Sequence, residues 1–189
     1  MIAIIAEKPS VGMDIARVVG ADTRNDGYCS GNGYMVTWAL GHLVSLATPD
    51  TYGYTKTAAE DLPMLPDPFR LVSRQMRTDR GMVTDIAASK QLKVIESVFN
   101  RCDSIIVATD AGREGELIFR WIYDFLGCTK PFRRLWISSL TDEAIRKGLE
   151  ELKDGSEYDS LYAAADSRAK ADWLVAVSYT HLRAHETKA

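Results

Sequence analysis

Three acidic residues come just after two short apolar runs of this sequence. Glu7 follows the run at residues 2–6, and Asp110 and Glu114 follow the run at residues 104–108. In an open parallel sheet, ligands bind beyond the carboxyl ends of the strands, so two neighbouring strands would bring these carboxylates into one crevice. Three carboxylates at one place repel each other unless a hard cation such as Mg²⁺ holds them. Spacing alone leaves a second interpretation open, in which acids at the start of a helix only cap it.

The residues between and beside these acids are suited to a phosphate group. Lys8 and Arg113 carry positive charge next to the acids and would neutralise a phosphate bound there. Gly112 and Gly115 allow a close approach of the backbone and a tight turn. The sequence contains no G-x-x-x-x-G-K-[ST] pattern, and "GREGE" lacks the G-x-G-x-x-G of a dinucleotide site. A metal and phosphate site here would therefore work without a nucleotide cofactor, and the interpretation of the acids as helix caps stays open.

Strands that alternate with helices predict a parallel, doubly wound α/β sheet flanked by helices. The expected strands are residues 2–6, 104–108 and 133–138, and the expected helices are residues 11–19, 85–100, 115–127, 157–174 and a capped one within 139–155. Residues 27–40 are typical of a hairpin with Gly-Asn-Gly at its turn, and residues 41–72 of a loop-rich excursion. Arg133 and Arg134 are expected at a solvated strand edge.

The length and composition of the chain allow one domain with a real core, and part of a second. The chain has 189 residues, 46% of them hydrophobic, and a formal net charge of -3. The acidic balance argues only weakly against DNA binding, because a basic groove can exist on an acidic protein. The three cysteines show no metal-binding spacing, and the first apolar run is too short for a signal peptide or a membrane span. We expect a cytoplasmic protein with reduced thiols and no membrane partner.

The last residues of the sequence do not continue the pattern before them. Residues 177–189, "VSYTHLRAHETKA", show no apolar period and contain two of the three histidines of the chain. We interpret them as a non-native tail of read-through sequence. On this interpretation Tyr179 is not a candidate nucleophile, and His181 and His185 are not a metal-binding pair despite their spacing.

Several separated blocks of the sequence resemble one known family. They are "AEKPSVGMDIARVVG", "VTWALGHLVSL", "EDLPMLP", "ATDAGREGELIFRWI", "RLWISSLTDEAI" and "SRAKADWLV", and they extend to about residue 176. Together they are similar to the amino-terminal part of the bacterial DNA topoisomerase III family, whose members are type IA topoisomerases. The resemblance implies a Toprim domain, a Rossmann-like parallel sheet, over residues 1–152. It also implies that residues 153–176 begin a helical DNA-binding domain.

The resemblance assigns roles to the acidic residues. Glu7 matches the Toprim glutamate that is proposed to act as general acid and base, and we group Lys8 with it as a candidate catalytic residue. Asp110 and Glu114 match the first and last acids of the family pattern D-x-D-x-E, so they are expected metal ligands together with Glu7. Gly112 stands where this pattern has its middle acid. We therefore expect a single tightly held Mg²⁺.

The family reaction consists of two transesterifications on DNA. A tyrosine attacks one strand and becomes linked to its 5′ phosphate, a second strand passes through the gap, and the 3′ hydroxyl then reverses the link. The phosphotyrosine conserves the energy, so no ATP hydrolysis is needed, which agrees with the missing P-loop pattern. The resemblance places the nucleophilic tyrosine beyond residue 189, so we expect none in this chain and expect the chain alone to be inactive.

Candidate contacts to single-stranded DNA come from three parts of the sequence. Arg168 and Lys170 in "DSRAKADW", together with Arg113, are candidates for phosphate contacts, and Trp173 is a candidate for sugar or base contacts. His42 in "LGHL" matches a Gly-His of the family. Alternatives stay open for two of these residues. Trp173 can instead be a core residue of a structural helix, because helical aromatics are usually core residues. A buried, hydrogen-bonded histidine would explain His42 equally well.

Two other functions stay open from the sequence alone. The first keeps the fold and changes the chemistry, as a stand-alone Toprim nuclease or primase-like enzyme that needs no tyrosine. The missing second Asp and the matching blocks outside the Toprim core count against it. The second is a non-catalytic module that binds Mg²⁺ or nucleic acid, which fits a chain without a nucleophile.

Overall fold

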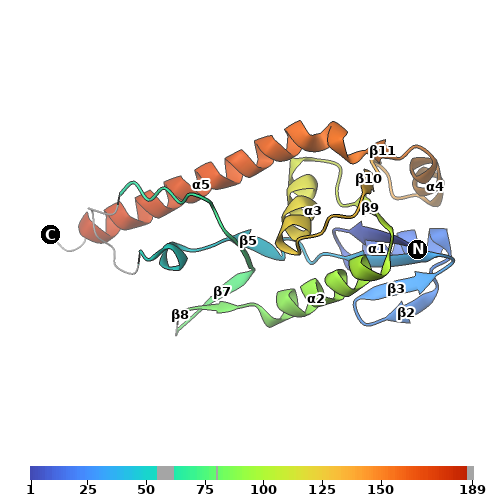
Figure 1. Cartoon of the computed structure of the whole chain (residues 1–189), viewed down its shortest axis with the longest axis horizontal. Coiled ribbons are helices and arrows are strands. Elements are labelled where there is room, and N and C mark those ends of the chain that lie inside the picture. The colour runs from blue at the N-terminus through green and yellow to red at the C-terminus, as the bar shows by residue number, and fades with distance from the viewer. Residues whose placement is uncertain (55–61, 80, 187–189) are drawn as a thin grey trace.

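A seven-stranded sheet forms the core of the α/β body, which lies toward one end of the molecule in Figure 1. The computed structural model describes residues 1–54, 62–79 and 81–186. In the order β11-β10-β9-β1-β4-β3-β2, the strands are Lys153–Asp154, Phe132–Arg134, Ser104–Ala108, Ile2–Ala6, Tyr34–Trp38, Tyr28–Gly31 and Thr23–Asn25. Two further antiparallel pairs lie outside this sheet, namely β5 (Val44–Leu46) with β6 (Leu71–Ser73), and β7 (Gln75–Thr78) with β8 (Gly81–Thr84).

The predicted parallel sheet is confirmed at the centre, and antiparallel strands extend it at both edges. Strands β4, β1, β9 and β10 run parallel at the centre, whereas β3, β2 and β11 pair antiparallel at the two edges. The predicted hairpin is the cause at one edge, because a tight turn reverses the chain and can add only an antiparallel strand. Asn32 and Gly33 form this turn with positive φ angles of 46° and 81°. The predicted turn is therefore confirmed.

Helices cover both faces of the sheet, as the doubly wound pattern predicts. They are α1 (Pro9–Val19), α2 (Ile86–Arg101), α3 (Arg113–Phe125), α4 (Asp142–Glu150) and α5 (Asp159–Glu186), with two short 3-10 turns, η1 (Pro49–Tyr52) and η3 (Gly155–Tyr158). Two of the helices begin two residues earlier than their apolar patterns predict. Pro9 presets the first turn of α1, which leaves Lys8 as its N-cap, and α3 begins at Arg113.

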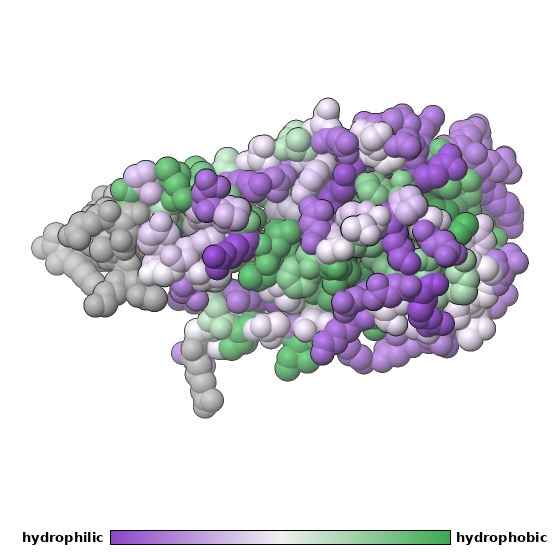
Figure 2. Space-filling model, in the orientation of Figure 1, coloured by the Kyte–Doolittle hydropathy of each residue, from purple (hydrophilic) through white to green (hydrophobic). Residues whose placement is uncertain are grey.

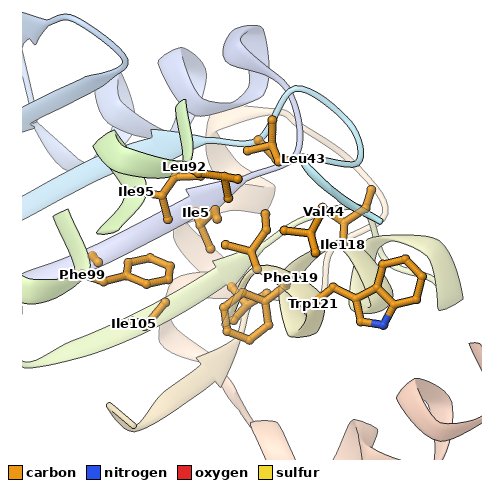
Figure 3. Close-up of a cluster of buried hydrophobic side chains, with 14 of the residues drawn as sticks. Ile5, Leu43, Val44, Leu92, Ile95, Phe99, Ile105, Ile118, Phe119 and Trp121 are labelled. Carbon is orange, nitrogen blue, oxygen red and sulfur yellow. The ribbon is translucent and has the colours of Figure 1, made fainter. Parts of the chain in front are cut away.

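The side chains of β1 divide between two hydrophobic cores. Successive strand residues point to opposite faces, so Ile5 joins the core beneath α2 and α3, and Ile4 joins the core beneath α1 and α4. Figure 3 shows Ile5 between Leu92 of α2 and Phe119 of α3. Figure 2 shows further apolar residues near the middle of the molecule's face, with hydrophilic residues around them. Burial on both faces explains why the central strands are apolar throughout.

The last helix extends further than its sequence pattern predicts. The pattern predicts an end at about residue 174, whereas α5 continues to Glu186 and extends past the α/β body (Figure 1). No Gly or Pro follows residue 174 to stop it. Side chains after residue 177 lie outside the described part of the structure, so the non-native tail at 177–189 stays a prediction. Within the described ranges, every helix is too short or too polar to cross a membrane.

A buried ion pair lies under the loop between β9 and α3. The side chains of Arg134 and Glu116 are both 0% exposed, with Arg134 Nε 3.0 Å from Glu116 Oε2. Arg134 also donates hydrogen bonds of 2.8 to 3.0 Å to three backbone carbonyls between Val107 and Asp110. Burial lowers the pKa of Arg134, and the charge of Glu116 opposes that shift. The expected solvated edge is therefore wrong for Arg134, because alternation along β10 turns Arg133 outward and Arg134 inward.

Removal of Glu116 should leave Arg134 as an uncompensated buried charge. We expect Glu116→Ala to lower the free energy of unfolding by about 3–5 kcal/mol. The matched control Glu96→Ala removes an exposed acid of α2 and should change this free energy by about 0.5 kcal/mol or less. Urea denaturation followed by circular dichroism measures both values. Equal stability of the two variants would show that the ion pair does not hold this loop.

Candidate active site at the carboxyl ends of the central strands

Glu7 and Asp110 lie together at the carboxyl ends of two neighbouring strands. Strands β1 and β9 pair in parallel with Ala6 opposite Ala108, so the residues that follow leave the sheet side by side. The Glu7 Oε2 atom accepts a hydrogen bond of 3.3 Å from the backbone N–H of Asp110. The two acid-bearing loops therefore meet at the edge where open α/β sheets bind ligands.

Lys8 adds a positive charge to this crevice. It is the N-cap of α1, and its Nζ lies 3.5 Å from Asp110 Oδ2. The two side chains are 60% and 57% exposed, so their ion pair contributes little to stability. Both groups can therefore reach a ligand, and the amino-terminal end of α1 favours an anionic one.

Glu114 does not join the other two acids. It lies in the first turn of α3 with its side chain 71% exposed, and its Oε1 lies 2.5 Å from Nε2 of His42. Among the described residues, no three His, Cys, Asp or Glu side chains lie close enough together to hold a metal ion. In this structure the Glu7 carboxylate contacts the backbone N–H of Asp110, and the Glu114 carboxylate contacts the imidazole of His42. The metal-ligand set stays a prediction.

The two glycines of the loop before and within α3 have different roles. A Cβ at Gly115 would lie 2.0 Å from the carbonyl oxygen of Asp110, so only glycine lets α3 start this close to that backbone. The Thr109 hydroxyl donates to the Gly115 carbonyl at 2.7 Å and closes the turn. Gly112 has extended backbone, and nothing lies within 4 Å of where its Cβ would be. The predicted close approach is confirmed at Gly115, whereas Gly112 has open space for a side chain.

A cavity lined by α3 and α5 brings together three of the predicted DNA contacts. It has a volume of about 470 Å³, and its lining includes Arg113, Arg168 and His42. Two carboxylates, Glu114 and Asp172, share the lining, and Arg168 Nε lies 3.7 Å from an oxygen of Asp172. Leucine, tryptophan and alanine side chains form the rest of the wall. Arginines beside apolar surface suit a nucleotide, with its phosphate on the arginines and its base or sugar on the wall.

Lys170 and Trp173 face a different part of the molecule. Trp173 donates its indole N–H to the carbonyl of Ala47 at 2.9 Å and makes an edge-on ring contact with Phe69. Lys170 Nζ lies 2.5 Å from a carboxylate oxygen of Asp166 on the same helix. This packing agrees with the alternative in which Trp173 is a core residue, because its indole packs α5 against the loop-rich residues 41–72. The DNA contacts of these two residues stay predictions.

Two features beside Asp110 were not predicted from the sequence. Asp110 borders a second cavity, of about 330 Å³, whose lining includes residues of α1 and the hydroxyl-bearing Ser138 and Ser139. The other feature is the buried Arg134, which binds the Asp110 carbonyl at 2.8 Å. Strand alternation is a sequence signal that could have predicted the burial of Arg134, because it puts Arg134 on the same face of β10 as the aromatic Phe132.

Curated relatives match this chain over nearly its whole length. A protein named DNA topoisomerase 3 from Shouchella clausii is 49% identical over 190 residues, and one from Bacillus subtilis is 46% identical over 189 residues. Each alignment covers 98% of this chain and 24% of the relative, so the chain spans about a quarter of the length of the curated relatives it matches. The solved full-length topoisomerase I from Thermotoga maritima aligns with 80% of this chain and 21% of its own chain, at 18% identity and a TM-score of 0.49.

One domain family accounts for most of the chain. The Toprim domain matches residues 2–140. The match includes the parallel centre of the sheet and both loops that carry Glu7 and Asp110, and it ends before α4 and α5. This chain belongs to the Toprim domain family.

Proposed function

We propose that this chain is the amino-terminal part of a type IA DNA topoisomerase of the topoisomerase III kind. Such an enzyme breaks one DNA strand, passes another through the gap and rejoins the first without ATP. The pairing of β1 with β9 carries the proposal, because it sets Glu7, Lys8 and Asp110 at one ligand crevice inside a Toprim domain. Relatives that are 46% and 49% identical and named DNA topoisomerase 3 support the same function.

The proposed reaction consists of two transesterifications at one phosphodiester. A tyrosine hydroxyl from elsewhere in the whole enzyme loses its proton to water and forms a bond from its oxygen to phosphorus, and the bond from phosphorus to the 3′ oxygen breaks. Glu7 gives a proton to the departing 3′ oxygen and takes it back when that oxygen attacks the phosphotyrosine. One Glu7 oxygen accepts the Asp110 N–H, which leaves the other oxygen to carry the proton. Lys8 places positive charge where the phosphate gains negative charge.

Mg²⁺ is the cofactor that suits this crevice. Glu7 and Asp110 offer hard oxygen ligands from two loops that meet, and Glu114 would complete the set. Mg²⁺ commonly binds through one or two carboxylates together with waters and phosphate oxygens, which these loops fit. When bound, the ion would orient the scissile phosphate and screen its charge. With Gly112 in place of a further acid, one ion is expected.

Single-stranded DNA is the proposed partner. The cavity with Arg113, Arg168 and His42 would hold part of the strand whose phosphate reaches the crevice. In this proposal residues 1–152 form the Toprim domain, and residues 153–176 begin a helical DNA-binding domain that continues in the whole enzyme. A cytoplasmic setting follows from the DNA substrate.

A chimera tests the proposed reaction. Residues 1–176 of this chain, joined to the remainder of the Bacillus subtilis relative, should form covalent adducts with labelled single-stranded DNA. Glu7→Gln should slow adduct formation by about 10²–10⁴-fold, which is the usual contribution of general acid–base catalysis. Glu96→Gln, on the exposed face of α2, is the matched control and should leave the rate unchanged. Denaturing gels measure the adduct.

The chain alone separates the topoisomerase from the nuclease alternative. It should give neither adducts nor cleaved strands when it is incubated with the same DNA and Mg²⁺. Cleavage products with free ends, lost in Glu7→Gln, would support a stand-alone Toprim nuclease and contradict the proposal.

The open space at Gly112 predicts how the metal site responds to a further acid. We expect Gly112→Asp to fold normally and to bind Mg²⁺ several-fold more tightly, because it adds a carboxylate beside Asp110 without a clash. Gly112→Asn is the matched control, since asparagine caps a helix as well as aspartate but carries no charge. Isothermal titration calorimetry measures the affinity. Equal affinities of the two variants would show that position 112 does not face the ion.

The cavity predicts a salt-dependent DNA contact at Arg168. Arg168→Gln should weaken binding of labelled single-stranded DNA. It should also make the negative slope of log K against log salt shallower by about 0.7, the value for one phosphate contact. Lys93→Gln removes one charge from an exposed site on α2 and should change neither quantity. Fluorescence anisotropy at several salt concentrations measures both. The same loss in the two variants would indicate attraction by overall charge and no contact in the cavity.

A further inference from the structure

His42 holds the one metal-ligand candidate that does not lie in the crevice. Its Nε2 lies 2.5 Å from Glu114 Oε1. The other two contacts of the acids are longer, at 3.3 Å from the Asp110 N–H to Glu7 and 3.5 Å from Lys8 to Asp110. The three acids therefore have three different partners, and the shortest of these contacts is the one that Glu114 makes.

Neighbours fix both the backbone and the ring of His42. Arg74 donates Nη1 to the His42 carbonyl at 3.0 Å, and its Nε and Nη2 bind Asp85 at 2.8 and 2.6 Å. The imidazole packs edge-on against Trp121, with the ring centroids 5.8 Å apart. Trp121 in turn belongs to the core around Ile5 (Figure 3). Because His42 is held from two sides, the exposed Glu114 side chain is the partner that can move.

We propose that His42 is a positioning residue that holds Glu114 outside the crevice until a divalent cation takes it. This inference rests on the proposed function, which provides the cation. A Glu114 carboxylate that turns toward Asp110 must give up its hydrogen bond to the fixed imidazole. Hydrogen bonds to charged groups are strong enough that this loss weakens cation binding by about ten-fold or more.

A histidine beside a metal-binding carboxylate can also act in the opposite way. A carboxylate has two oxygens, and a partner on one can orient the other toward the metal, so removal of that partner costs about 10–100-fold in affinity. The position of Glu114 favours the first role over this one. With Glu114 on the imidazole, no three potential ligands among the described residues lie close enough to hold an ion. The two roles predict opposite effects when His42 is replaced.

Titrations of the chain with Mg²⁺ separate the two roles. His42→Phe keeps a ring against Trp121 but cannot bond Glu114, and its Kd for Mg²⁺ should fall by about ten-fold or more. His42→Gln keeps an N–H donor and should bind Mg²⁺ like the unaltered chain. In a Glu114→Gln background, His42→Phe should have no effect. Isothermal titration calorimetry measures each Kd, and circular dichroism checks that each variant is folded.

Tryptophan fluorescence gives a second readout that is independent of activity. Departure of Glu114 changes the charge beside the imidazole that contacts Trp121, so Mg²⁺ should alter the emission of the unaltered chain. The chain has four tryptophans, so the Trp121→Phe variant identifies the source of the change. The Mg²⁺-dependent change should be absent in Trp121→Phe and in His42→Phe.

Asp110→Asn distinguishes failure of this inference from failure of the proposed metal site. If Mg²⁺ binding depends on Asp110 but His42→Phe leaves the affinity unchanged or weaker, the inference is overturned and the proposed function stands. Equal tightening in His42→Phe and His42→Gln also overturns it, because the hydrogen bond would not be the cause. If the unaltered chain shows no binding that depends on Asp110, the metal site and the inference are overturned together.

Discussion

The in-register, parallel pairing of β1 with β9 is the constraint on which the site depends. Ala6 lies opposite Ala108, so both chains leave the sheet at the same edge and at the same level. Helices bury both faces of these strands, which leaves their carboxyl ends as the open edge. Acidic side chains can stand at that edge because water and ligands reach it. Burial of the strands thus decides where the chemistry can be.

A second constraint fixes the loop that leaves β9. Arg134 reaches under this loop from β10, donates to one carbonyl of β9 and two of the loop, and forms an ion pair with Glu116 of α3. Buried ion pairs add little net stability, so the role of this pair is better understood as holding β10, the loop after β9 and α3 in fixed relative positions. Gly115 completes this arrangement, since a side chain there would displace the Asp110 carbonyl that Arg134 holds. The Asp110 backbone is fixed while its carboxylate stays exposed to the crevice.

Local signals in the sequence were sufficient for most of the fold and for part of the site. Apolar runs predicted β1 and β9, and the position of Glu7 and Asp110 followed from them. Contacts between residues that are far apart in the sequence could not be predicted from local signals. Nothing local shows that Arg134 meets Glu116, or that Glu114 turns to His42, because these contacts depend on how separate elements pack. Helix α5 was underestimated because its period fades where no stop signal follows.

The repulsion among three carboxylates has a solution here that needs no cation. The Asp110 N–H satisfies Glu7, Lys8 faces Asp110, and His42 takes Glu114. Acids that already have a hydrogen-bond or ion-pair partner would bind a cation less tightly than a cluster of unpaired acids. Their loops are already formed, however, so cation binding would not have to order them. Such an arrangement suits the proposed chemistry, because Glu7 must exchange a proton with a strand end and cannot be committed wholly to a metal ion. Because each acid has a separate contact, each can change its partner in the proposed reaction.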